Sequence, residues 1–192
     1  MAPCNLKSVI LSGESCETNY AGVGDRVYFG LKSDLDKKPT IDDFETGKNC
    51  YKSSAFSDLQ GKLYAIDIKA DSGQVTGEGA EGVEGHSNVG TFVVDKNVDD
   101  AVAVLRSARM LDTIWFIPDG KGKYYVLYSA TKKAKVADNY DSGTTYDSDH
   151  GLTVTITVAP CEFAECKYAP MTTGSSPEPV DLDDWLKTST SL

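Results

Sequence analysis

The chain has 192 residues, of which 40% are hydrophobic and 25% are charged, and its formal net charge is −10 at neutral pH. The hydrophobic content excludes an intrinsically disordered chain, and the length fits one domain with a substantial core. The acidic balance argues against a protein that coats duplex nucleic acid, because phosphate binding depends on clustered Lys and Arg, although solubility explains a large net charge equally well.

The N-terminal residues carry no targeting pattern that we can identify. Residues 1–7 show no basic region followed by a long apolar segment, and no stretch of the sequence approaches the ~18 apolar residues needed to cross a bilayer. We therefore expect a protein that is made in the cytoplasm and stays outside the membrane.

Residues 6–11 form the first candidate strand.

Alternation of apolar and polar residues in short runs predicts half-buried strands. The runs lie at residues 27–31 and 64–68 and, most clearly, at 152–158, where four aliphatic residues alternate with three threonines. Because the strands are numerous and short, they favour an antiparallel β-sandwich or barrel over a parallel α/β sheet.

A glycine-rich, acidic segment spans residues 71–90, and it is too polar to build a core of its own. It is either a flexible surface loop or the tip of a long hairpin with arms at 74–77 and 89–94, ordered only against a neighbouring subunit. On the second interpretation the inter-subunit arm consists of Gly77, Glu78, Gly79, Glu81, Gly82, Glu84 and Gly85.

One helix is predicted from Asn97, which caps its first turn, and it leads into a β-hairpin. Asp99 and Asp100 lie where the helix dipole favours anions. The hairpin has strands at 113–117 and 124–128, joined by a Pro-Asp-Gly turn. The helix carries an apolar stripe of Val98, Ala101, Val102, Leu105 and Ala108, of which we expect Val98, Ala101, Val102 and Leu105 to be buried against the sheet.

The C-terminal part has a different composition. Residues 172–179 are rich in Thr, Gly, Ser and Pro, as in a linker, and the short amphipathic helix that follows places Leu182, Trp185 and Leu186 on one face. This apolar face docks either on its own subunit or on the next one. The predicted organisation is thus a β-domain at 1–169, with its loop at about 71–90, and a linker with a tail at 170–192.

The sequence contains no recognisable catalytic or metal-binding pattern. Motifs of hydrolases, nucleotide-binding proteins and metalloproteases are absent, His86 falls in the glycine-rich loop and His150 in a turn. Five irregularly spaced cysteines favour reduced thiols, Cys161 and Cys166 included, over a disulfide framework or a zinc site. The aspartates at 147–151 resemble the opening of a calcium loop but lack its later ligands, so a tight turn is favoured. We predict no catalytic residue, no cofactor and no metal.

The order of these elements resembles the major tail tube proteins of long-tailed, siphovirus-like bacteriophages and prophages of Bacteroidetes. The similarity covers about residues 60–168: the strand at 63–68, the glycine-rich segment, the strand at 91–95, the helix, the hairpin, and the segments 140–145 and 147–155. It implies a β-sandwich or barrel with one flanking helix, joined into hexameric rings that stack around a DNA-conducting channel.

The resemblance also implies a location and a set of partners. The location would be the virion tail, assembled in the cytoplasm of the host bacterium. The partners would be further copies of the chain, the tail terminator and baseplate or hub proteins, with DNA passing through without specific binding and no membrane involved. The chain has 29 acidic and 19 basic residues, and interfaces between subunits usually exclude unpaired charge. The surplus of acidic residues should therefore lie on the outer wall of the tube and in its channel. In the channel we expect a ring of Asp and Glu with few Lys or Arg.

Other classes of function stay open. Ten tyrosines and two tryptophans suit a carbohydrate-binding or adhesin-like β-domain, but sandwich cores and interfaces contain the same residues. A capsid decoration or tail completion protein would share the predicted elements, and an enzyme of unknown class is the last alternative. Particles seen by electron microscopy would separate rings and tubes from small monodisperse domains.

Overall fold

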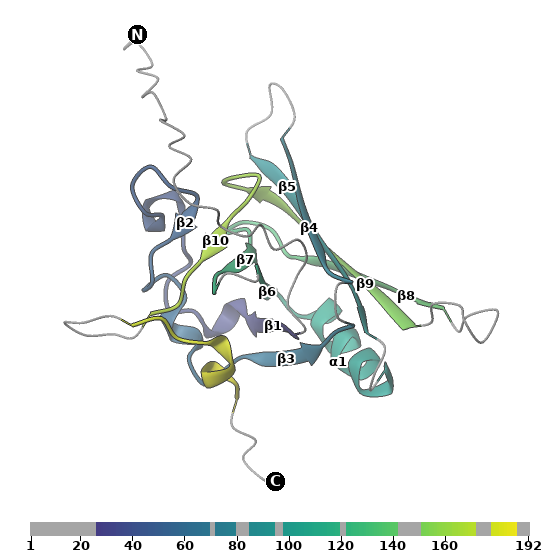
Figure 1. Cartoon of the computed structure of the whole chain (residues 1–192). Coiled ribbons are helices and arrows are strands. Elements are labelled where there is room, and N and C mark those ends of the chain that lie inside the picture. The colour runs from purple at the N-terminus through teal and green to yellow at the C-terminus, as the bar shows by residue number, and fades with distance from the viewer. Residues whose placement is uncertain are drawn as a thin grey trace, which may run out of the picture.

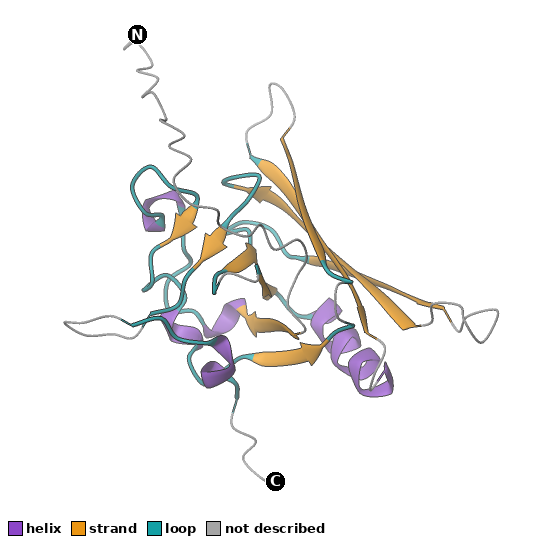
Figure 2. Ribbon diagram, in the orientation of Figure 1, coloured by secondary structure: helices purple, strands orange, loops and turns teal. Residues whose placement is uncertain are grey.

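The computed structural model describes residues 26–69, 72–79, 85–94, 98–119, 122–141, 151–171 and 178–187. Two β-sheets pack face to face, and one α-helix lies at the end of the sandwich (Figure 1; Figure 2). The alternating pattern therefore predicts the fold class correctly: a mainly β sandwich with a flanking helix. The candidate strand at 6–11 and most of the turn at 147–151 lie outside the described residues.

The first sheet has six strands in the order β2-β10-β7-β6-β1-β3. Its central hairpin, β6 with β7, is the one predicted from the sequence. The pairing is antiparallel, as expected, except between the two-residue strands β10 and β2, which run parallel. The strands are β1 (Arg26–Leu31), β2 (Cys50–Tyr51), β3 (Tyr64–Asp67), β6 (Thr113–Pro118), β7 (Tyr124–Leu127) and β10 (Lys167–Tyr168).

The second sheet has four antiparallel strands in the order β4-β5-β9-β8. In Figure 1 it extends past the six-stranded sheet at both ends. Along β9 the aliphatic residues 152, 154, 156 and 158 are buried and the threonines between them face the other way, as the alternation predicts. The strands are β4 (Gln74–Gly79), β5 (His86–Val94), β8 (Lys135–Asp141) and β9 (Gly151–Cys161).

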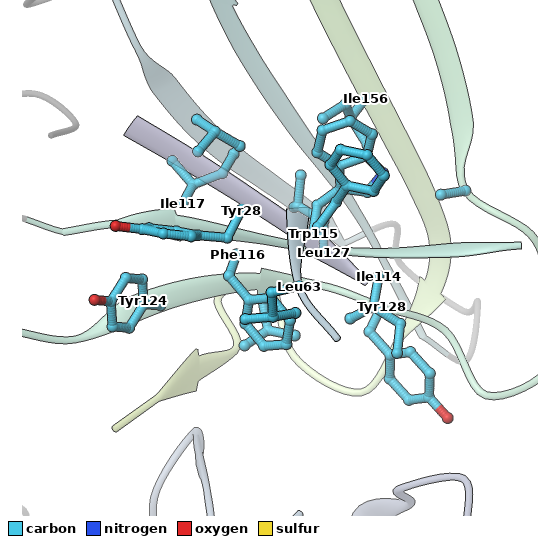
Figure 3. Close-up of a cluster of buried hydrophobic side chains, with 14 of the residues drawn as sticks. Tyr28, Leu63, Ile114, Trp115, Phe116, Ile117, Tyr124, Leu127, Tyr128 and Ile156 are labelled. Carbon is cyan, nitrogen blue, oxygen red and sulfur yellow. The ribbon is translucent and has the colours of Figure 1, made fainter. Parts of the chain in front are cut away.

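The core between the sheets is aromatic and aliphatic (Figure 3), with Trp115 and Ile156 fully buried. The two sheets approach closely at Gly90 of β5, where a Cβ would lie 2.6 Å from the Cδ1 of Ile117. The opposite face of the six-stranded sheet is also covered, because Phe56 packs edge-on against Phe116 and Tyr168. Residues 27–29 of β1 are consequently buried on both faces, which corrects the half-buried strand expected at 27–31.

Short 3-10 turns connect the strands and line this second apolar layer. The turn at Ser57–Leu59 contributes buried Leu59, and the turn at Leu182–Trp185 contributes two buried side chains. The short C-terminal helix predicted for the tail is thus a single 3-10 turn. Two further turns lie at Lys32–Asp34 and Ile41–Asp43.

Helix α1 (Val98–Met110) packs at the end of the sandwich beside β8. Its buried stripe consists of Ala101, Leu105 and Ala108, which are spaced at i, i+4 and i+7. Val102 is 41% exposed, so the prediction of its burial is wrong: it lies one residue, or about 100° around the axis, from Ala101 and points away from the sheet. Asn97 and the side chain of Val98 lie outside the described part.

No helix within the described ranges combines the length and the apolar character needed to cross a membrane.

Candidate assembly surface on the four-stranded sheet

In the part of the chain that the structure describes, each outer strand of the four-stranded sheet is paired on one side only. β4 pairs with β5 alone and β8 with β9 alone. Within the described ranges, no backbone hydrogen bond from another segment reaches residues 74–79 or 135–141. Every residue of β4 except Val75 is exposed, as are five of the seven residues of β8. An unpaired row of N–H and C=O groups is a template for a further strand.

The six-stranded sheet differs, because other segments form backbone hydrogen bonds next to both of its outer strands. Beyond β3, the Leu63 amide donates to the Trp185 carbonyl at 3.1 Å, and the Lys187 amide donates to the Leu63 carbonyl at 2.8 Å. Beyond β2, the Glu45 amide donates to the Cys50 carbonyl at 2.8 Å. Among the described residues, backbone pairing thus continues next to both outer strands of the six-stranded sheet, whereas none continues beyond β4 or β8.

The directions of the two open edges are opposite. Four strands that alternate in direction place β4 and β8 antiparallel to one another. When copies repeat by rotation about an axis, β8 of one copy meets β4 of the next, and the joined strands are again antiparallel. The edges are thus compatible with a continuous antiparallel sheet that passes from copy to copy.

The face of this sheet that points away from the core is rich in hydroxyl groups. Strand pairing places Thr155 in one row with Thr91 and Ala137, and Thr157 in the next row with Val89 and Lys135. The charged residues at the described positions of this face are few: Glu78, Lys135 and Asp141. The hydroxyl-bearing residues of the face are Thr76, Ser87, Thr91, Thr153, Thr155 and Thr157.

Part of the predicted arm lies in β4 or next to β5. Gly77, Glu78 and Gly79 belong to β4 and Gly85 precedes β5, whereas Glu81, Gly82 and Glu84 lie outside the described residues. The glycines are explained by close packing and not by flexibility alone. A Cβ on Gly77 would overlap the carbonyl oxygen of Ala164, and one on Gly79 would lie 2.8 Å from the His86 ring.

This packing corrects two expectations for the glycine-rich segment. A flexible loop throughout 71–90 is wrong, because β4 and β5 form a paired hairpin whose arms extend further than 74–77 and 89–94. His86 is the first residue of β5, opposite Gly79, and does not lie in a loop. Whether a neighbouring subunit contacts the hairpin stays a prediction.

The three predicted tail-docking residues lie against their own chain. Leu182 and Trp185 are buried, and half-buried Leu186 forms a parallel bridge with Leu63. The Tyr28 hydroxyl donates to Asp183 at 3.0 Å and the Tyr124 hydroxyl donates to Asp181 at 3.0 Å. Burial, together with these carboxylates, raises the pKa of both phenols, so both hydroxyls keep their protons as donors at neutral pH.

The cysteines in the described ranges show no sign of a reactive site. Cys50, Cys161 and Cys166 are buried and free. Burial raises the pKa of Cys161 to about 12 and that of Cys166 to about 11, which keeps both thiols protonated and poorly nucleophilic at neutral pH. Among the described residues, no three His, Cys, Asp or Glu side chains are grouped so that they would hold a metal ion.

The edge strand β8 is the part of this surface that the sequence did not predict as a strand. Its inward positions hold Val136 and Asp138, so the period-2 apolar signal is nearly absent. Asp138 is tolerated beside the helix because Arg109 of α1 forms an ion pair with it. The one feature of the sequence related to β8 is the pair Arg109 and Asp138, and an analysis of apolar and polar alternation does not detect such a pair.

No protein-family model matches the chain, and no curated protein or solved structure matches it. The open edges and the hydroxyl-rich face are therefore the observations from which a function is inferred.

Proposed function

We propose that the chain is the major tail tube protein of a long-tailed bacteriophage or prophage, a structural subunit whose copies form stacked rings around a DNA-conducting channel. The single observation that carries the proposal is the four-stranded sheet with two unpaired edges of opposite direction. The sequence resemblance supports the same function. Hexameric rings, the virion tail as location, and the tail terminator and baseplate or hub proteins as partners belong to the same proposal.

The geometry of the edges favours a closed ring over an isologous dimer. A contact between β8 of one copy and β4 of the next joins two different surfaces, and such head-to-tail contacts close into rings when the rotation between copies allows it. A sheet that closes in this way removes every open edge, which is the most complete protection against uncontrolled strand addition. The tilt of strands in a closed barrel also permits a shift in register between neighbouring copies.

The same geometry indicates which face lines the channel. The core face of the four-stranded sheet is covered by the six-stranded sheet and by α1 (Figure 2), so the bulk of each copy must lie outside the barrel. The hydroxyl-rich face then points inward. Among the described residues of this face the acidic ones are Glu78 and Asp141. Weak adhesion of DNA would follow from the scarcity of cations on the face.

The aromatic residues favour this proposal over a carbohydrate-binding domain. Sugar-binding platforms need exposed aromatic rings, but Trp115 and Trp185 are 0% and 4% exposed. Of the large hydrophobic residues that the described structure exposes strongly, the only aromatic one is Tyr140. Capsid decoration and tail completion proteins stay as alternatives within the class of virion structural proteins.

Cross-linking of the two edges tests the proposal directly. Thr76 of β4 and Ala137 of β8 are exposed and lie on the same face of the sheet. In a background with Cys4 and Cys16 replaced by serine, the Thr76→Cys/Ala137→Cys double variant should give a ladder of disulfide-linked oligomers on a non-reducing gel. Each single variant should not, because a head-to-tail contact pairs unlike edges.

Electron microscopy of the unmodified chain provides the second readout. Rings or tubes are expected as the protein concentration rises. Particles of monomer size at every concentration, combined with no ladder from the double variant, would reject the proposal. A ladder that stops at the dimer would instead indicate an isologous contact and rule out the ring.

A further inference from the structure

A basic cleft opens at the edge of the sheet where β8 begins. It has a volume of about 680 Å³, and four of its eight lining residues are basic: Arg109, Lys132, Lys133 and Lys135. The remaining lining residues are small or apolar, such as Ala134 and Thr157. A concentration of positive charge of this kind is unexpected in a chain with a net charge of −10.

The loop that carries Lys132 and Lys133 is held in place by internal contacts. Buried Lys32 donates from its Nζ to the Lys132 carbonyl at 2.7 Å, and Asp112 neutralises the same ammonium group at 3.0 Å. The Nζ of Lys133 donates to the carbonyl of Met110 at the end of α1, at 2.6 Å. The cleft is therefore preorganised, which lowers the entropic cost of binding a partner.

The charge of this cleft is only partly neutralised. Arg109 pairs with Asp138, but the ion pairs formed by the described residues include none that involve Lys132, Lys133 or Lys135. Lysines gathered on a rigid loop repel one another unless an anion lies near them. The cleft thus suits a ligand with one or more carboxylates.

The strand register within one copy indicates which carboxylate of a neighbouring copy would lie near the cleft. Pairing across the sheet places Lys135 in one row with Thr157, Val89 and Thr76. Glu78 lies two residues beyond Thr76, toward the end of the sheet where Lys133 lies. Antiparallel joining of copies without a shift brings Glu78 of the next copy level with Lys133, and a shift of two residues brings it level with Lys135. In the shifted register, Glu78 and Lys135 lie on the same face of the sheet.

We propose that the basic cleft receives the acidic end of β4, with Glu78, from the next copy of the chain. The inference rests on the proposed ring assembly and names the contact that sets its register. Glu78 is exposed and belongs to β4, which contains no basic residue, so its charge complements the cleft. Charge pairs across an interface determine the partner and the register more than they add affinity.

Charge reversal tests this contact. Lys135→Glu and Glu78→Lys should each raise the concentration needed for assembly by about tenfold, because like charges then lie close together in every interface of the ring. Position 135 is level with position 78 in the shifted register and two residues from it in the unshifted one. The double variant Glu78→Lys/Lys135→Glu should restore assembly to near the level of the unmodified chain. Sedimentation measures the assembled fraction, and circular dichroism confirms that each variant is folded.

The matched control is Lys38→Glu, an exposed residue in the loop before the second 3-10 turn that changes the net charge by the same amount. It should assemble like the unmodified chain. If the unmodified chain assembles and both single variants do so equally well, the cleft contact is wrong and the ring proposal stands. Failure of the double variant to recover, with folded monomers, also overturns the pairing. An unmodified chain that never assembles overturns both proposals.

An unrelated anion is the competing occupant of the cleft, and a short DNA duplex is the probe for it. Binding of the duplex to the monomer that falls steeply with salt and is lost in Lys133→Glu would assign the cleft to phosphates and reject Glu78 as its ligand. Absence of duplex binding, together with recovery in the double variant, is the result that we expect.

Discussion

Single glycines in the hairpin have a defined structural role. Gly77 faces the core side of β4, where its α-carbon lies against the backbone of Ala164 in the loop after β9. No side chain fits at this position unless one of the two backbones moves. The glycine-rich composition of the segment therefore reflects, at this point, close packing between β4 and the loop after β9.

Replacing this glycine should destabilise the monomer. Gly77→Ala is expected to lower the free energy of unfolding by about 1–3 kcal/mol, because the added methyl group overpacks a backbone contact. Thr76→Ala, at the neighbouring exposed position, should change it by less than about 0.5 kcal/mol. Urea denaturation followed by circular dichroism measures both. Equal stability of the two variants would mean that β4 does not lie against Ala164.

The sequence pattern predicted correctly the strands in which apolar and polar residues alternate, and it gave the wrong burial for a strand that is buried on both faces. β9 has aliphatic residues on one face and threonines on the other, so its pattern is sufficient. β1 is buried on both faces, because Leu59 and Leu63 lie against Gly30 on the side away from the core. The C-terminal turn covers the same side, where Asp183 accepts a hydrogen bond from Tyr28. That cover is built from segments distant in sequence, which no local pattern reveals.

The strands of the candidate assembly surface were predicted in part, for the same physical reason. The glycine-rich segment marked β4 and its hairpin, since glycines and glutamates cannot form a core. The partner edge β8 was not identified as a strand, because its one inward charge, Asp138, is compensated by Arg109 from a helix. Lys132 and Lys133 were not predicted as part of a site either, because they form a cleft only after folding, when their loop lies beside Arg109 and Lys135.

Helix α1 offers a test of which residues anchor the end of the sandwich. Leu105 is fully buried and Val102 is 41% exposed, although both belong to the predicted apolar stripe. Leu105→Ala should cost about 2–5 kcal/mol of stability through the lost contacts and the cavity that remains. Val102→Ala should cost less than about 0.5 kcal/mol. If the two variants unfold at the same denaturant concentration, the orientation of α1 is wrong.

For the molecule as a whole, the proposed contacts and the chemistry of the channel are linked. Lys135 is the one basic residue on the described part of the hydroxyl-rich face, and the proposed pairing with Glu78 would neutralise it in every ring. The channel wall would then hold hydroxyl groups and Asp141 but no unpaired cation from these strands. Such a wall would bind the phosphates of DNA only weakly, because it lacks cations. An acidic ring would then not be needed for the DNA to pass.

Introducing a cation at the centre of this wall should therefore convert a passage into a binding site. Thr155 lies in the middle row of the sheet, between Thr91 and Ala137, on the face proposed to line the channel. Tubes of Thr155→Lys should retain linear duplex DNA at low salt and release it as salt rises, because each lysine on the wall displaces counterions from the phosphates. Tubes of Thr155→Gln, which adds length without charge, should not retain it.

The topology of the DNA distinguishes the channel from the outer surface. A linear duplex can thread into a closed tube, whereas a covalently closed circle cannot. Retention of the linear form alone by Thr155→Lys tubes, measured by co-sedimentation, is the expected outcome, since residues inside the barrel are reached only through its ends. Equal retention of circles would place Thr155 on the outer wall, and the orientation of the four-stranded sheet in the ring would then be the reverse of the one proposed.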